Sequence, residues 1–296
     1  MKRQFPKVGR PGGARLTRRG RLVVVAGVVG VVAVAVSLFL PSFREQPRPP
    51  KQVTRPKALV IPEGWRSSQV YAAVDTALGL RPGSTRRAAV AHGPHLRLPV
   101  VARGNPEGFL FPATYPLDEG TTPAGLLSYM VNTAGHRFGT SPVNAGAQRH
   151  GMTLYQAVVV ASIVQAEAET VAEMGKVARV IHNRLDQGMP LQMDSTLNYA
   201  LNRSTLDTTH EDTKIESPYN TYGRRGLPPT PIGNPGEAAM KAAISPPPGD
   251  WLYFVTVAPG DTRFTADFDE QRENVDEFNA RRRSAAEDSE ERTTEE

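Results

Sequence analysis

One uninterrupted apolar run near the N-terminus limits what this chain can be more than any other feature. Residues 22–40 read LVVVAGVVGVVAVAVSLFL, which is 19 residues without a charged side chain. A helix of about this length crosses the ~30 Å hydrocarbon core of a bilayer. We therefore predict a single transmembrane helix over residues 22–40 rather than a helix buried in a soluble core.

The charges before this run predict its orientation. Residues 1–21 contain eight lysines and arginines and no acidic residue, so the formal net charge of +5 becomes −3 for the rest of the chain. By the positive-inside rule, this basic tail stays in the cytoplasm, and the chain after residue 40 lies on the outer side of the cell membrane. A cleaved signal peptide is the alternative, but its apolar stretch is usually only about 7–15 residues long.

Composition excludes several classes of function. The chain contains no cysteine, which removes disulfides, thiolate metal sites and cysteine nucleophiles. Its excess of basic residues belongs to the tail, so we expect no nucleic-acid partner for the folded part. The six histidines, among them His182 and His210, are scattered without the spacing of metal ligands. We predict no metal and no cofactor.

Composition also divides the rest of the chain. Residues 41–57 are rich in Pro, Arg and Lys and predict an extended linker. Two modules follow, over residues 58–142 and 150–280, and the polar, acidic residues 285–296 predict a disordered tail. Helical and strand patterns occur in both modules, which predicts an α+β fold. We expect helices to carry the principal functional glutamate and strands to form the floor beside it.

That glutamate is Glu167, within a predicted helix over residues 153–169. At about 100° per residue, Val160 and Ile163 lie on the same helical face as Glu167, whereas Ser162 and Glu169 lie opposite. A carboxyl on a buried face has a raised pKa and can act as a general acid.

A purely structural glutamate is the alternative. Arg179 or Arg184, on the next predicted helix, could neutralise Glu167 in a buried ion pair. The sequence of the helix leaves both interpretations open.

A polar region rich in proline follows over residues 189–235. It contains LQMDSTLNYAL (191–201) and SPYNTYGRRGLPPTPIGNPG (217–236). Aromatic rings stack on sugar faces, and amide and hydroxyl groups bond to sugar hydroxyls, so this composition suits a glycan-binding cleft. A rigid surface loop with no ligand is the alternative.

A series of motifs extends this interpretation. ASIVQAE (161–167), KVARVIHNRL (176–185), SPYNTY (217–222), GLPPTPIGNPG (226–236) and WLYFV (251–255) follow one another in this order. In order and spacing they closely resemble the endolytic murein transglycosylase family, also called YceG-like. IPEGWRSSQV (61–70) resembles the small LysM-like subdomain of that family. The resemblance implies a LysM-like subdomain and then a YceG-like catalytic domain, behind a single N-terminal transmembrane helix.

The resemblance implies cleavage of the β-1,4 bond between N-acetylmuramic acid and N-acetylglucosamine, with a 1,6-anhydromuramyl end as product. Many members carry Glu-x-Glu where this chain has Gln165 and Glu167, which leaves Glu167 as the catalytic residue. We expect substrate contacts from seven residues. They are Gln192, Asp194 and Thr196, which alternate along a segment expected to be extended, and Tyr219, Asn220, Thr221 and Tyr222.

Two other functions remain open. The chain could be a non-catalytic peptidoglycan-binding membrane anchor. It could also be a muramidase-type hydrolase that uses Asp194 and water beside Glu167. In each case the expected partners are peptidoglycan glycan strands and the cytoplasmic membrane. The resemblance adds peptidoglycan synthases and a role in ending nascent strands.

Overall fold

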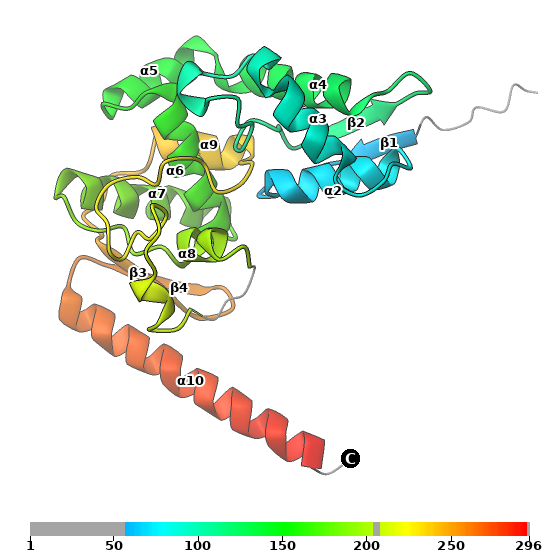
Figure 1. The fold of residues 1–296 in the computed structure, drawn as a ribbon. Helices are drawn as coiled ribbons and strands as arrows, with labels where there is room; N and C mark the ends of the chain where they lie inside the picture. The colour runs from blue at the N-terminus through cyan, green and yellow to red at the C-terminus, as the bar shows by residue number, and fades with distance from the viewer. Residues whose placement is uncertain (1–56, 204–207, 295–296) are drawn as a thin grey trace, which may run out of the picture. The chain divides into compact units, whose positions relative to one another are not determined.

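The computed structural model of the chain describes residues 57–203 and 208–294. The basic tail (1–21), the predicted transmembrane helix (22–40) and all but the last residue of the predicted linker lie outside these residues. No helix in the described part of the chain is both long and apolar enough to cross a membrane. Pro56–Glu296 forms one compact unit, whose elements are labelled in Figure 1.

The β-structure of the described residues consists of two small antiparallel sheets. β1 (Lys57–Val60) pairs with β2 (Thr114–Leu117), and β3 (Tyr253–Ala258) pairs with β4 (Asp261–Thr265). A sheet of two strands is marginal alone, so each depends on the helices packed against it. The α+β class is confirmed, and its helices dominate the described residues.

Most helices of the described residues lie between β1 and β3 in the sequence, with α2 and α3 before β2 and the others after it. They are α2 (Ser67–Ala77), α3 (Ser84–His92), α4 (Pro123–Phe138), α5 (Ser141–Arg149), α6 (Leu154–Glu167), α7 (Val171–Asp186), α8 (Asp194–Ala200) and α9 (Glu237–Ile244). Short 3₁₀ turns occupy Gly93–His95, Val100–Ala102 and Asp212–Lys214. The Thr153 hydroxyl accepts a hydrogen bond from the Gln156 amide and caps α6, as its sequence favours.

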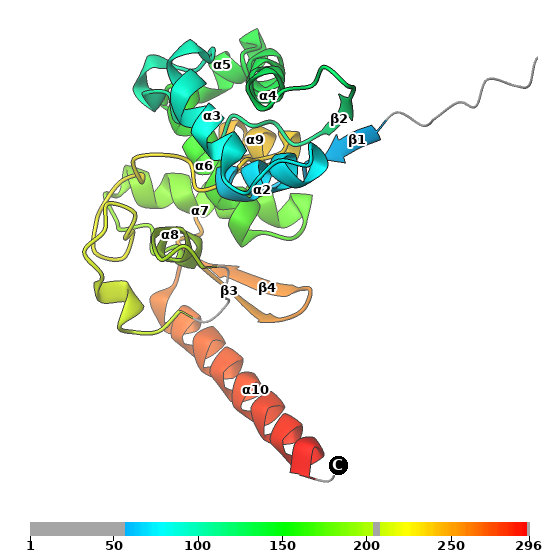
Figure 2. The ribbon, with the colours of Figure 1, turned by 45° about the vertical axis from the view of Figure 1, so that its right-hand side comes forward.

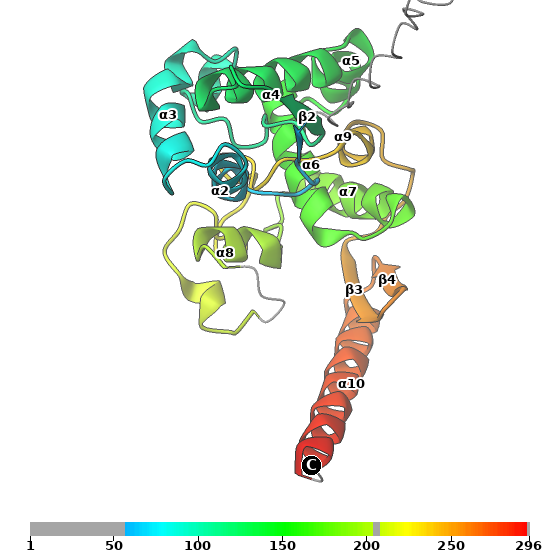
Figure 3. The same cartoon turned by 90° about the vertical axis from the view of Figure 1, so that its right-hand side faces the viewer.

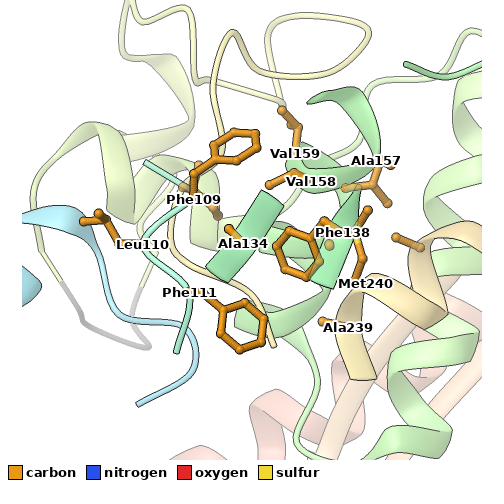
Figure 4. Packing of buried hydrophobic residues seen from close by; sticks show 14 of the residues in the cluster. Phe109, Leu110, Phe111, Ala134, Phe138, Ala157, Val158, Val159, Ala239 and Met240 are labelled. Atoms are coloured by element: carbon orange, nitrogen blue, oxygen red, sulfur yellow. The ribbon is translucent and has the colours of Figure 1, made fainter. Parts of the chain in front are cut away.

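α6 lies in the middle of the helical core. It packs against α5, α7, α8 and α9, and Figures 2 and 3 show it among these helices from two further sides. Every residue from position 157 to 164 is buried. Figure 4 shows Val158 and Val159 of α6 close to Phe138 of α4 and Met240 of α9. A helix that is apolar on all sides is one that its neighbours enclose.

This enclosure corrects the helical-face argument for α6. We expected Ser162 to lie on a solvated face, but its side chain is buried and its hydroxyl accepts a hydrogen bond from the Ile232 amide at 3.1 Å. Gln165 also faces protein, because its side-chain oxygen accepts from the Gly236 amide at 3.0 Å. Only Glu169, beyond the helix end, is exposed as predicted.

The two predicted modules share contacts rather than forming separate bodies. Asn234 donates its side-chain amide to the Trp65 carbonyl at 2.7 Å and accepts from the Leu110 amide at 2.8 Å. Gly233 lies so close to Gly64 that an added Cβ would be 2.7 Å from its carbonyl oxygen. The Pro-rich region of the second module is therefore fixed to the first.

The C-terminal tail differs from its prediction. We expected disorder from residue 285, but α10 (Phe268–Thr294) continues as a helix through that position. Alanine, glutamate and arginine are strong helix formers, so a polar composition alone did not determine the state of the backbone. At its start, α10 packs against the β3–β4 hairpin.

Candidate active site

Glu167 is the last residue of α6. Its carboxylate accepts a hydrogen bond from the backbone amide of Ser195, at 3.1 Å from N to Oε1. Burial raises the pKa of the Glu167 carboxyl above its ordinary value; the Ser195 contacts oppose this rise and the charge of Asp194 adds to it. The side chain is thus biased toward its protonated form, which a general acid needs.

No arginine of the described residues neutralises Glu167. Arg179 donates to the Pro247 carbonyl at 2.7 Å. Arg184 is buried and donates to the carbonyls of Leu191 and Leu252, at 2.7 and 2.6 Å. The alternative of a buried ion pair with Arg179 or Arg184 is therefore wrong, because both guanidinium groups hold main-chain carbonyls instead.

Asp194 is beside Glu167 but belongs to a different element from the one we expected. The backbone is helical from Asp194 onward, in α8, so Gln192, Asp194 and Thr196 do not alternate along an extended strand. Their neighbour Ser195 was not predicted as a site residue. Its importance follows only once α8 is known to place the Ser195 amide against Glu167.

Tyr222 is the second residue that contacts Asp194. Its phenol donates a hydrogen bond to Asp194 Oδ1 at 2.5 Å. Burial is the largest cause that raises the pKa of the Tyr222 phenol, followed by its hydrogen bond to Asp194 and the charges of Asp194 and Glu167. The phenol therefore stays protonated and remains a donor. Of the predicted residues, the structure gathers Glu167, Asp194 and Tyr222 into one cluster.

Three other predicted residues are buried supports for this cluster. The Thr196 and Thr221 hydroxyls lie 2.9 Å apart, and the Thr221 hydroxyl accepts from the Met193 amide at 3.0 Å. Asn220 donates to the carbonyl of Ile215 at 2.8 Å and accepts from the Tyr222 amide at 3.0 Å. These polar atoms bond within the protein, so Thr196, Asn220 and Thr221 support the loop from inside, and their predicted contacts with substrate stay a prediction.

The last two predicted residues differ in exposure, because Tyr219 is half-buried and Gln192 is exposed. The Tyr219 ring packs on Tyr199, with centroids 4.9 Å apart, and its hydroxyl bonds to Thr230 at 2.9 Å. Gln192 is exposed and has a left-handed backbone, with φ of 53°. Its side-chain oxygen accepts from Arg184 at 3.0 Å. A non-glycine residue in this conformation costs about 1 kcal/mol or more and occurs preferentially at functional sites.

A second buried carboxyl, Glu107, supports α8 from the far end. It accepts hydrogen bonds from the Ser67 amide at 2.9 Å and from the Tyr199 hydroxyl at 3.1 Å. Burial raises the pKa of Glu107 to about 7, against the opposing effect of these hydrogen bonds. Sequence reasoning did not single out Glu107. An acidic residue inside the apolar segment EGFLFP was the one available signal.

The described residues contain no group of three His, Asp or Glu side chains that could hold a metal ion. What the cluster offers is acid–base chemistry at Glu167, with a neighbouring carboxylate held by a phenol. The polar contacts come from α8 and the Pro-rich loop, so the expectation that strands form the floor beside Glu167 is wrong.

Comparison with known proteins identifies the family. The sequence profile of the YceG-like family matches residues 40–277, which is most of the chain. The chain belongs to the YceG-like family. This confirms the resemblance seen in the motifs and places Glu167, Asp194 and Tyr222 inside the matched region.

The relatives of this YceG-like chain carry one name. The chain is 34% identical over 173 residues to the endolytic murein transglycosylase of Bacillus subtilis, and the match covers 58% of this chain and 48% of that protein. It is 32% identical over 258 residues to the endolytic murein transglycosylase of Streptococcus pneumoniae serotype 2, covering 79% of this chain and 46% of that protein. The chain thus spans about half the length of these curated relatives.

The fold has a solved counterpart. The crystal structure of a YceG-like protein from Listeria monocytogenes is 29% identical and matches with a TM-score of 0.65. The match covers 74% of this chain and 75% of the other.

Proposed function

We propose that this protein is an endolytic murein transglycosylase that cuts the β-1,4 bond between N-acetylmuramic acid and N-acetylglucosamine. The observation that carries the proposal is the carboxyl of Glu167, which is half-buried, has no cationic partner among the described residues and accepts a hydrogen bond from the Ser195 amide. Relatives that are 34% and 32% identical to this chain are named for this activity.

The proposed reaction uses Glu167 twice. Its protonated carboxyl first gives a proton to the leaving glycosidic oxygen. The resulting carboxylate then takes the proton of the muramyl 6-hydroxyl, which attacks the anomeric carbon of the same sugar and closes a 1,6-anhydro ring. The nucleophile is intramolecular, so its effective concentration is high and no water must be positioned.

Asp194 has a supporting part in this proposal. Its negative charge raises the pKa of Glu167 and so favours the protonated starting state. Since Tyr222 donates to Asp194 Oδ1 at 2.5 Å, the carboxylate is held in place. Its proximity is also the observation that favours the second candidate, a muramidase-type hydrolase in which Asp194 activates water.

Substrate contacts are assigned by exposure. Gln192 is the exposed member of the predicted set and can present its side-chain NH₂ to the glycan, because its oxygen is occupied by Arg184. The Gln192 amide donates to the Thr221 carbonyl, and Tyr222, the residue after Thr221, adds aromatic surface together with Tyr219. Thr196, Asn220 and Thr221 keep the loop in shape.

The proposal includes a location and partners. Residues 22–40 would anchor the protein in the cell membrane, with residues 1–21 in the cytoplasm and the catalytic part outside. Residues 58–142 would contain the LysM-like subdomain. Nascent glycan strands would be the substrate, and peptidoglycan synthases the proteins beside which strand elongation ends.

Glu167→Gln tests whether the protein is an enzyme at all. Full-length protein in detergent would be incubated with uncrosslinked glycan strands, and strand shortening would be followed by chromatography. We expect cleavage by the wild type, a loss of at least about 100-fold in Glu167→Gln, and little change in the matched control Glu169→Gln. Strand binding without cleavage by the wild type would instead support the non-catalytic anchor.

A further inference from the structure

A small hollow lies in the same loop as Tyr222 and has no part in the reaction described above. Its volume is about 260 Å³. The residues that line it include Pro218, Thr221, Arg224, Arg225, Pro228 and Pro229. Three prolines make its walls stiff, because each fixes its own backbone φ angle.

The charged residues that line this hollow are both arginines. Arg224 and Arg225 are exposed, and no acidic side chain is among its lining residues. Neither guanidinium makes an ion pair with a described residue, whereas Arg137, Arg203 and Arg263 each bind a carboxylate. The hollow therefore presents two guanidinium groups whose charge the described protein does not neutralise.

The backbone that carries these arginines is fixed. The Arg224 amide donates to the Asn220 carbonyl at 3.1 Å, and Arg225 forms a β-bridge with Pro190. Asn220 is itself buried and bonded within the loop. Because the main chain is held at both residues, the guanidinium groups start from a defined place.

The hollow is also coupled to the candidate active site. Tyr222, two residues before Arg224, donates to Asp194, and the next residue, Ser195, donates to Glu167. A group of the substrate that reaches the hollow would therefore belong to a sugar unit at or near the bond that is cut.

We propose that Arg224 and Arg225 form a subsite for the free carboxylates of the peptides attached to N-acetylmuramic acid. This inference rests on the proposed function. A guanidinium group binds a carboxylate through two parallel hydrogen bonds, which gives both charge and shape recognition. An enzyme that cuts inside a strand meets a peptide-bearing muramyl unit at every cut. The pyrophosphate of a lipid-linked strand, by contrast, occurs only at its end.

The test compares two uncrosslinked strands that differ only in charge, one with free peptide carboxylates and one with carboxamides in their place. For the full-length wild type in detergent, we expect KM to be about three- to tenfold lower on the carboxylate strand, as for partly exposed charge pairs. In Arg224→Ala/Arg225→Ala this ratio should fall to about one. Arg81→Ala/Arg97→Ala removes the same charge at two exposed arginines outside the hollow and should keep the wild-type ratio.

Arg224→Lys/Arg225→Lys provides a second variant that keeps the charge but lacks the planar fork, and its ratio should lie between the two. The inference is overturned if the alanine variant keeps the wild-type ratio, or if KM rises equally on both strands. A ratio that depends only on a lipid pyrophosphate at the strand end would also overturn it. If the wild type cuts neither strand, the proposed function itself fails, and this result is distinct from all the others.

Discussion

Glu107→Gln should remove a pH-dependent part of the stability of this protein. Burial raises the pKa of Glu107 from 4.5 to about 7. A carboxyl with a raised folded-state pKa stabilises the fold fully below its unfolded pKa, and this contribution is lost as pH rises through the folded pKa. The loss thus falls between about pH 4.5 and pH 7 and amounts to about 3 kcal/mol.

Glutamine has nearly the same shape and does not titrate. Its oxygen can still accept from the Ser67 amide, and its NH₂ group can donate to the Tyr199 hydroxyl, where Glu107 now accepts. We therefore expect the free energies of unfolding of wild type and Glu107→Gln to be similar near pH 4.5. Near pH 8 the variant should be the more stable by about 3 kcal/mol.

Urea unfolding followed by circular dichroism, from pH 4.5 to pH 8, measures this difference. Glu169→Gln removes an exposed carboxyl and serves as the matched control, with a curve parallel to that of the wild type. Parallel curves for wild type and Glu107→Gln would refute the reasoning, because they would mean that burial does not hold the proton on Glu107.

Three further substitutions test other parts of the structure. Gly108→Ala should destabilise the fold by about 2–4 kcal/mol in urea unfolding, since φ is +85° and the new Cβ would lie 2.5 Å from Pro231; a change below 0.5 kcal/mol would contradict this close packing. Thr153→Ala should cost about 1 kcal/mol by the same assay, through loss of the α6 cap, whereas Thr153→Ser should cost little. Tyr222→Phe leaves Asp194 without its phenol donor, so kcat/KM should fall about tenfold. The alkaline limb of the pH–rate profile should also move to higher pH. A limb that stays in place would show that Asp194 does not influence the pKa of Glu167.

The sequence predicted several elements well because their signals are local. Thr153 before an apolar run marked the start of α6, and the strand pattern expected in the second module corresponds to the β3–β4 hairpin. The catalytic role of Glu167 stays a prediction, and the structure corrects the helical-face argument that led to it. α6 is enclosed on all sides, so no single face of the helix distinguishes Glu167. Its position at the helix end, against Ser195, does.

The rest depended on contacts between distant segments. Thr221 resembles a sugar ligand in sequence, yet its hydroxyl bonds to Thr196 across 25 positions. Glu107 and Tyr199 are 92 positions apart, and nothing local to either predicts their hydrogen bond. Polar side chains in a Pro-rich loop can support the fold or bind ligand, and only the tertiary structure shows which of them have their bonding capacity filled.

The most direct test of the central proposal is the mass of the strand ends that the wild-type protein produces. We expect each cut to leave a 1,6-anhydromuramyl end, lighter by one water than a reducing end, with no such ends from Glu167→Gln. Reducing ends in place of anhydro ends would contradict the transglycosylase proposal, because a water activated by Asp194 would then be the nucleophile.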